Sequence, residues 1–126
     1  MRKSRTAMNA SFLLAAALCG TALTAHAAEN APLAGCVDLG SDKEVVRAGS
    51  TRSMLLRNAD SHYLLTFRDD CGSLPMTSTI RIIGDGTEDR LCPGATTVQT
   101  RREDCAVSSI ETLDAKQFAS RKRRAR

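Results

Sequence analysis

The chain has 126 residues, with 18 basic and 14 acidic side chains and a formal net charge of +4. Three basic residues lie among the first five positions and five lie among the last six, so residues 28–120 carry 10 basic and 14 acidic residues. This mildly acidic body excludes nucleic-acid binding that depends on overall charge. The length fits one small domain with a modest core, because the chain has three phenylalanines, one tyrosine and no tryptophan.

The N-terminus has the three parts of a secretory signal peptide. A basic start is followed by a mostly apolar stretch over residues 12–23, and Ala25 and Ala27 form a small-x-small site. We expect cleavage between Ala27 and Ala28, which makes residues 1–27 the signal peptide. The apolar stretch is shorter than the roughly 20 residues that a membrane span needs, and we expect no transmembrane segment later in the chain. The sequence therefore predicts a periplasmic or secreted protein.

Four cysteines remain after cleavage: Cys36, Cys71, Cys92 and Cys105. An even number of cysteines in a small exported domain predicts disulfides, because the compartment is oxidising. Three pairings are open, and we favour Cys36–Cys105 with Cys71–Cys92 nested inside it. Four thiolates on zinc are the alternative, but the chain has no Cys-x-x-Cys pair. We therefore expect two structural disulfides, no metal and no cofactor.

The first strand candidates follow a mature N-terminus, residues 28–35, that we expect to be flexible. Residues 44–47 and 52–57 are short strand-like runs with a turn between them. Residues 62–68 alternate large apolar side chains on one face with a mixed set on the other, which is typical of a strand. The turn-forming residues 58–60 separate this run from the preceding one, so we expect the two strands to pair antiparallel.

Three further strand-like runs lie at residues 79–83, 96–100 and 105–112. Turn-forming or charged residues separate them. Residues 113–120 have a weak helical pattern without a clear cap. The set predicts an all-β fold over residues 36–113, a small antiparallel barrel or sandwich of about six short strands. Residues 114–126 are predicted to be a disordered basic tail.

The sequence around each cysteine carries a resemblance to a known family. The segments are "CVDLG" from Cys36, "HYLLTFRDDCGSL" through Cys71, "RLCPGATTV" through Cys92 and "CAVSSIETL" from Cys105. Their order and spacing resemble small exported bacterial proteins of the domain of unknown function 6491 family, over most of residues 36–113. The polar "GSDKEVVRAG" departs from the family's apolar first strand, and the basic tail lies outside the match. The resemblance implies an exported, cysteine-stapled β domain and implies no activity.

His62 is the one histidine left after cleavage, so a nucleophile–histidine arrangement would depend on it. Ser53 or Ser61 as nucleophile, with Asp60 orienting the imidazole, would form such a set if the fold brought them together. None of these residues lies in a nucleophile elbow. We expect no catalytic residues, and keep a small periplasmic hydrolase or an enzyme inhibitor that uses the His62 region as the alternative.

Two acidic stretches are weaker candidates. Asp85, Glu88 and Asp89 lie in one loop and offer oxygen atoms to calcium, but the loop lacks the longer pattern that calcium sites need. We expect a polar hairpin turn there. Asp69 and Asp70 are adjacent, so on a strand they point to opposite faces, and a solvated strand end is favoured over acid–base chemistry.

The C-terminal cations are the remaining candidate site: Arg121, Lys122, Arg123, Arg124 and Arg126. Such a cluster binds phosphates in nucleic acids, but export removes that partner. We favour a merely solvated terminus, because a terminal charge run usually has no bound partner, and keep an envelope protein or an anionic envelope surface as the alternative. The sequence thus predicts a non-enzymatic binding or structural module of the cell envelope, whose ligand it does not identify.

Overall fold

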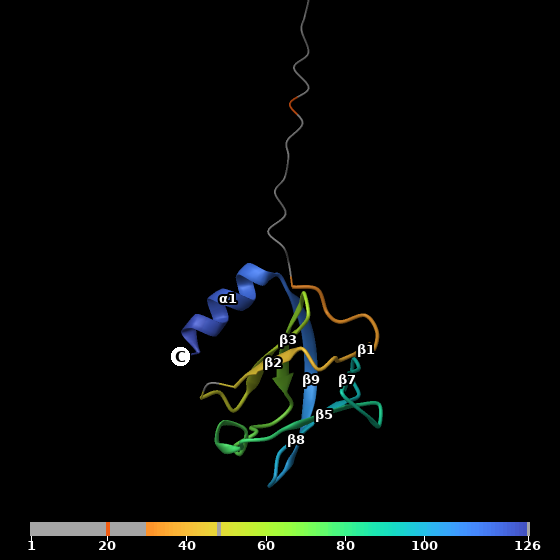
Figure 1. The fold of residues 1–126 in the computed structure, drawn as a ribbon, viewed down its shortest axis with the longest axis vertical. Helices are drawn as coiled ribbons and strands as arrows, with labels where there is room; N and C mark the ends of the chain where they lie inside the picture. The colour runs from red at the N-terminus through yellow and green to blue at the C-terminus, as the bar shows by residue number, and fades with distance from the viewer. Residues whose placement is uncertain (1–19, 21–29, 48, 126) are drawn as a thin grey trace, which may run out of the picture.

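The computed structural model describes residues 20, 30–47 and 49–125. The predicted signal peptide, with Ala25 and Ala27, lies outside the described residues except for Gly20. Ala28, on the other side of the predicted cleavage site, and Arg126 also lie outside them. Figure 1 shows a curved sheet with the short strands β1 and β7 beside it and a helix at the C-terminus. No helix within this part of the chain has the length and apolar character to cross a membrane.

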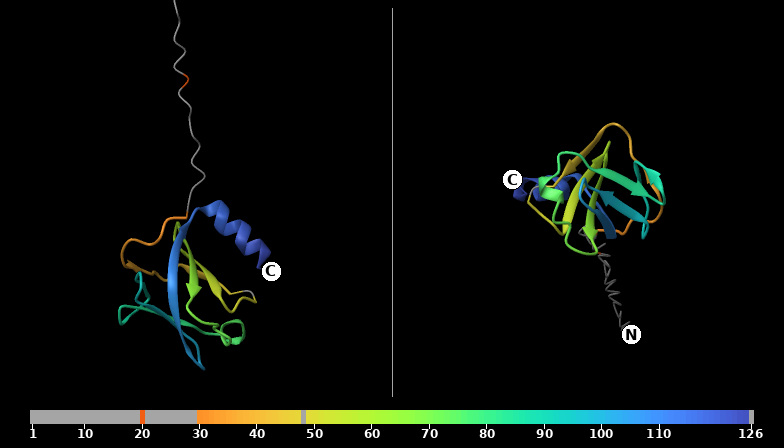
Figure 2. Two further views of the ribbon diagram at one scale, coloured as in Figure 1. Left: turned by 180° about the vertical axis from the view of Figure 1, so that it is seen from behind. Right: turned by 90° about the horizontal axis from the view of Figure 1, so that it is seen from below.

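The described residues form a seven-stranded antiparallel sheet that curves into a half-barrel (Figure 2). In spatial order its strands are β2 (Lys43–Val46), β3 (Ser53–Asn58), β4 (Ser61–Phe67), β9 (Asp104–Leu113), β8 (Thr96–Gln99), β5 (Arg81–Gly84) and β6 (Thr87–Glu88). A separate pair joins β1 (Val37–Asp38) to β7 (Arg90–Leu91), and the helical segments are the short 3-10 helix η1 (Leu74–Met76) and the α-helix α1 (Ala115–Arg124). The predicted fold class is confirmed.

The predicted β3–β4 hairpin is also confirmed. Leu56 pairs with Tyr63, and the turn between the strands contains Ala59 with a positive φ of 51°. The alternation read from the sequence places Tyr63, Leu65 and Phe67 in the core, where each is at most 4% exposed. The hairpin thus forms the central part of the core.

A β-bulge in β9 changes which of its side chains face the core. Thr66 pairs with Ser109 and Phe67 pairs with Val107, so Ser108 is an extra residue on β9. The Ser108 hydroxyl donates to the carbonyl of Thr66 at 3.0 Å. The extra residue keeps both Val107 and Ile110 in the core although three positions separate them. The bulge also allows the long strand β9 to pair with β4 in one half of the sheet and with β8 in the other.

The structure corrects the predicted disulfide pairing: Cys36 is bonded to Cys92 and Cys71 to Cys105. Cys36 precedes β1 and Cys92 follows β7, and because Val37 pairs with Leu91 the two cysteines lie side by side, with their Cα atoms 4.2 Å apart. Cys71 follows β4, whose neighbour β9 carries Cys105. The nested pairing is wrong because β1 pairs with β7, which holds Cys36 beside Cys92.

Hydrogen bonds to the sheet also order the first described residues, from Asn30 onward, where the sequence predicts a flexible segment over residues 28–35. The Leu33 amide donates to the Ile110 carbonyl at 2.9 Å, and the Thr112 amide donates to the Ala31 carbonyl at 2.8 Å. These bonds satisfy backbone groups of β9 on the edge that β4 does not cover. The folded domain therefore begins before Cys36.

β5 and β7 pass very close to each other at Gly84. A Cβ atom built on Gly84 would lie 2.8 Å from the carbonyl carbon of Arg90 and 3.1 Å from the amide nitrogen of Cys92. Real Cβ atoms do not approach a backbone carbon so closely, so this crossing depends on the missing side chain.

Candidate functional site

Residues 114–125 of the basic C-terminal segment are folded, with α1 over Ala115–Arg124, which corrects the prediction of a disordered tail for all of residues 114–126 except Arg126, which lies outside the described residues. Asp114 caps α1: its side chain accepts a hydrogen bond from the Gln117 amide at 2.7 Å, and the Gln117 side chain accepts one from the Asp114 amide at 3.0 Å. This reciprocal capping box stabilises the first turn of the helix. The basic residues Arg121, Lys122, Arg123 and Arg124 lie in the last turns of α1, where cations interact favourably with the helix dipole.

α1 packs on the outer face of the β3–β4 half of the sheet. Phe118 is 5% exposed and forms a small apolar cluster with Leu55 and Leu113. The side chain of Leu64 packs against this cluster from β4. The sheet is thus buried on both faces here, with the core on its concave side and α1 on the other. This second buried face fixes where the helix cations lie.

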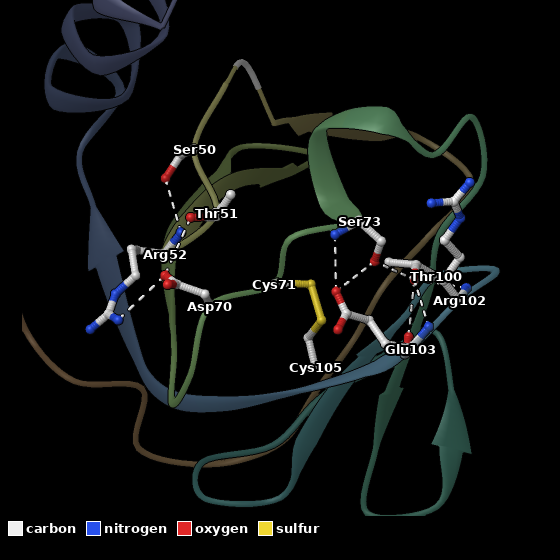
Figure 3. The surroundings of a disulfide bond; sticks show 10 residues. All are labelled: Ser50, Thr51, Arg52, Asp70, Cys71, Ser73, Thr100, Arg102, Glu103 and Cys105. Atoms are coloured by element: carbon white, nitrogen blue, oxygen red, sulfur yellow. Dashed lines mark hydrogen bonds and ion pairs between the residues drawn. A yellow bond between two sulfur atoms is a disulfide. The ribbon is translucent and has the colours of Figure 1, made fainter.

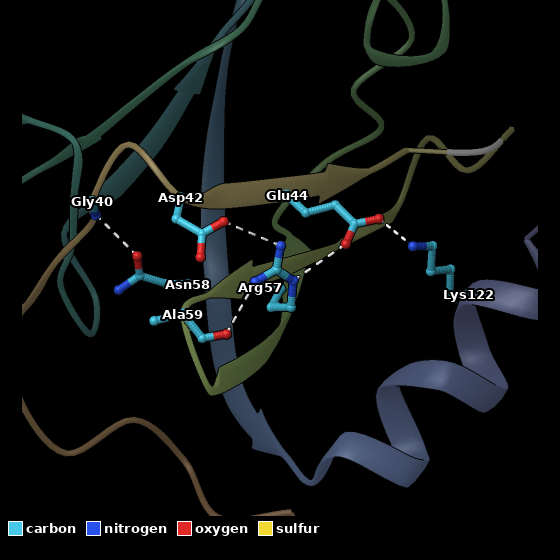
Figure 4. Close-up of polar contacts among 7 residues, drawn as sticks. All are labelled: Gly40, Asp42, Glu44, Arg57, Asn58, Ala59 and Lys122. Atoms are coloured by element: carbon cyan, nitrogen blue, oxygen red, sulfur yellow. Dashed lines mark hydrogen bonds and ion pairs between the residues drawn. The ribbon is translucent and has the colours of Figure 1, made fainter.

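An ion pair joins α1 to the edge strand β2, as Figure 4 shows. The Lys122 ammonium donates to Glu44, and Arg57 also donates to Glu44, at 3.3 Å. The hydrogen bond from Lys122 is the largest cause that lowers the pKa of the Glu44 carboxyl; Arg57 lowers it further, whereas partial burial raises it. The Lys122 side chain therefore helps to hold α1 against β2.

A cleft opens between the C-terminal half of α1 and strands β2, β3 and β4. It encloses about 330 Å³, and we call it the α1 cleft. Three arginines line it: Arg47 at the end of β2, and Arg121 and Arg124 on α1. Ser50 and Ser53 add two hydroxyl groups. No acidic side chain of the described residues lines the cleft, so its positive charge is uncompensated at close range.

His62 lies on β4 below α1, away from the candidate nucleophiles. Its ring packs against that of Phe118, with centroids 4.9 Å apart. Ser53 pairs with Thr66, at the far end of the hairpin from His62. Ser61 precedes His62 and points to the opposite face of the strand. Within the described residues the imidazole makes no hydrogen bond to a serine or an aspartate, so the predicted alternative set is not assembled.

The acidic loop at the end of β5 is the predicted hairpin turn. Asp85 and Gly86 have φ values of 50° and 75°, the backbone of a tight two-residue turn. Glu88 accepts two hydrogen bonds from Arg81, at 2.9 and 3.1 Å, and this contact lowers the pKa of Glu88. Asp89 accepts from Lys43 at 2.8 Å. Two of the three carboxylates are thus paired with cations from different strands, which disfavours a shared calcium ion.

Asp69 and Asp70 are exposed at the end of β4, as expected of a solvated strand end. Asp70 contacts Arg52 at 3.4 Å and accepts from the Thr51 hydroxyl at 3.3 Å, whereas Asp69 is solvated. Figure 3 shows Asp70 on one side of the Cys71–Cys105 disulfide. The two carboxylates do not face each other across a site.

A second cleft, of about 430 Å³, lies on the other side of that disulfide. Within it Glu103 accepts hydrogen bonds from the Ser73 amide at 2.9 Å and from the Ser73 hydroxyl at 2.7 Å (Figure 3). The hydrogen bond from the Ser73 amide is the larger of the two causes that lower the pKa of Glu103. Glu103 also lies close to Cys71 and Cys105, but their sulfur atoms are bonded to each other and are not thiolate ligands for a metal.

The chain matches no protein-family model, no curated protein and no solved structure. The similarity to the domain of unknown function 6491 family stays a prediction. The geometry of the domain itself therefore has to indicate its function.

Of the predicted site residues, four cations fall on α1, and two of these, Arg121 and Arg124, meet in the α1 cleft. Sequence reasoning missed Arg47 and Ser50, and considered Ser53 only as a nucleophile for His62; the end of β2 and the start of β3 bring all three to the same cleft. A loop arginine and two serines carry no signal of their own. Only the position of α1 makes them part of a site.

Proposed function

We propose that this protein is an exported binding domain, not an enzyme, and that its C-terminal helix binds anionic groups of the cell envelope. One observation carries the proposal. α1 is docked by Phe118, and within the described residues Arg121, Arg123 and Arg124 have no acidic partner. Cations held on a packed helix lose less conformational freedom on binding than cations in a disordered tail. Export is supported by the two disulfides, which persist in oxidising compartments.

The outer face of α1 is the expected contact with an anionic surface. Lys116 and Arg123 are exposed there. Each basic residue close to an anionic membrane contributes about 1 kcal/mol of binding free energy, and salt weakens the attraction. Binding should therefore depend on the anionic lipid fraction and should fall as ionic strength rises.

The test is co-sedimentation with vesicles that contain phosphatidylglycerol, compared with vesicles of phosphatidylcholine alone. Lys116→Glu with Arg123→Glu should weaken binding to anionic vesicles at least tenfold, because two attractive charges become repulsive. Arg101→Glu with Arg102→Glu is the matched control, since it changes the net charge equally at an exposed turn on another part of the sheet. Equal losses in both double variants, or equal binding to both kinds of vesicle, would refute binding through α1.

A further inference from the structure

The α1 cleft has the donors of a defined anion-binding site. Arg47 directly follows β2, whereas Arg121 and Arg124 lie on successive turns of α1. Within the described residues the guanidinium groups of Arg121 and Arg124 have no hydrogen-bond or ion-pair partner. Arg47 donates to the Thr77 carbonyl, which anchors its side chain and leaves its other N–H groups available. Planar guanidinium groups bind phosphate oxygens in bidentate pairs.

Ser50 adds a hydroxyl whose proton is available. Its oxygen accepts hydrogen bonds from the amides of Arg52 and Ser53, at 3.3 and 3.2 Å. These contacts use its acceptor sites, so the hydroxyl proton must point elsewhere. Among the described residues, the one side chain within hydrogen-bond distance of the Ser50 hydroxyl is that of Ser53, whose hydroxyl lies 3.4 Å away, a long contact. An anion in the cleft would accept a shorter hydrogen bond from Ser50.

The floor of the cleft is apolar. Val46, Leu55 and Leu64 line it beside the arginines, together with Met54. A volume of about 330 Å³ is at the low end of the roughly 300–1,000 Å³ that small-ligand sites enclose. This is larger than one phosphate ion needs, because a water molecule takes about 30 Å³. A ligand that fills the cleft therefore combines an anionic head with a short apolar part.

We propose that the α1 cleft binds the phosphate group of an amphiphile, with Arg47, Arg121 and Arg124 around the phosphate and the apolar part against Leu55 and Leu64. A phosphate fits better than a carboxylate, because its additional oxygens can accept from three guanidinium groups and a hydroxyl together. This inference rests on the proposed function and names the chemical group that is bound. It adds a saturable site to the attraction between α1 and an anionic surface.

The test is calorimetric titration of the intact oxidised protein with three soluble probes: inorganic phosphate, dihexanoyl phosphatidic acid and dihexanoyl phosphatidylcholine, each lipid below its critical micelle concentration. Saturable binding of the phosphatidic acid, at least tenfold tighter than that of the other two probes, is expected. Equal affinity for inorganic phosphate would overturn the role of the apolar floor. Equal affinity for the phosphatidylcholine would overturn recognition of an anionic phosphate.

Substitutions test whether the phosphatidic acid binds in the α1 cleft. Arg121→Gln with Arg124→Gln should weaken phosphatidic acid binding at least tenfold, whereas Arg101→Gln with Arg102→Gln removes the same charge at an exposed turn away from α1 and should change it less than twofold. Equal losses would overturn the cleft as the site. Far-UV circular dichroism of each variant checks that α1 is intact. Replacing Arg121 and Arg124 by lysine keeps the charge but not the bidentate donors; a severalfold loss is expected, and unchanged affinity would show attraction by charge alone and overturn the defined site.

The two proposals fail in different ways. If anionic vesicles bind through Lys116 and Arg123 but soluble phosphatidic acid does not bind, the cleft assignment is wrong and the proposed function stands. If the protein binds neither anionic vesicles nor soluble phosphatidic acid, both the proposed function and the cleft assignment are wrong.

Discussion

The β1–β7 end of the molecule is held by covalent bonds, whereas the α1 end is held by side-chain contacts. At the first end Cys36 is bonded to Cys92, and the Cys71–Cys105 bond joins the segment after β4 to β9. At the other end Phe118 and the Lys122–Glu44 pair hold the helix on the sheet. Covalent bonds constrain the whole chain, but packing of one helix can be lost locally. We therefore expect the disulfide-bonded end to determine the free energy of global unfolding, and α1 to detach from the sheet while the rest of the domain stays folded.

The largest expected effect comes from removing the disulfides. Each closes a loop, with sequence separations of 56 and 34 residues, and the chain-entropy model assigns about 4 kcal/mol to loops of such lengths. Cys71→Ala with Cys105→Ala should lower the free energy of unfolding by about this amount, measured by urea denaturation. The buried position of Cys71 adds a packing loss.

Peptide mapping without reductant checks the connectivity itself. It should join the peptide with Cys36 to the peptide with Cys92, and the peptide with Cys71 to the peptide with Cys105. A loss of less than about 1 kcal/mol for the double variant would show that the covalent end does not dominate stability.

The next effect should be confined to the α1 end. Phe118→Ala empties the centre of the cluster with Leu55 and Leu113, and truncations of buried phenylalanine cost about 3 to 5 kcal/mol. Hydrogen exchange should show that the amides of α1 lose protection while those of β4 keep it. Met76→Ala is the control, because Met76 is 81% exposed and its truncation should change stability by less than about 0.5 kcal/mol. Equal loss of protection in α1 and β4 would contradict independent opening.

The same contrast explains how much the sequence predicts. The alternation of Tyr63, Leu65 and Phe67 is local, and it correctly identified β4 and its buried face. The disulfide pairing was mispredicted because it depends on β1 meeting β7, two strands of two residues each with no periodicity to detect.

The prediction of a disordered tail failed for a different reason. The many basic residues favoured the interpretation as a solvated tail, and two sequence features that indicate a docked helix were overlooked. Asp114 three residues before Gln117 is a capping-box pattern, and the run Met54, Leu55 and Leu56 is apolar on both sides of its strand. The α1 cleft was not predictable, because its residues come from segments that only tertiary packing brings together.

The smallest expected effect is that of pH on α1. Because the pKa of Glu44 is lowered in the folded protein, its contribution to stability is present above the ordinary pKa of about 4.5 and is lost as the pH falls through the folded value. Partly exposed ion pairs contribute at most about 1 kcal/mol. Hydrogen exchange of α1 should therefore accelerate modestly from pH 5 to pH 3, after correction for the intrinsic rate.

Two variants isolate this effect. Glu44→Gln should remove most of the pH dependence of α1 opening, because the side chain no longer titrates. Glu88→Gln removes a carboxyl whose pKa is also lowered, but by Arg81 on β5, and should leave α1 opening unchanged. The same pH dependence in the Glu44 variant as in the native protein would show that this ion pair does not hold the helix.

The close crossing at Gly84 limits which sequences can share this fold. Every side chain other than hydrogen would push β5 away from the Arg90 carbonyl, and Arg90 belongs to the strand that aligns Cys92 with Cys36. Gly84 lies eight residues before Cys92. Exchange of the cleft arginines would leave the sheet and both disulfides in place, but losing this glycine would misplace a cysteine. We therefore expect relatives that share this fold to vary on α1 and to keep the glycine.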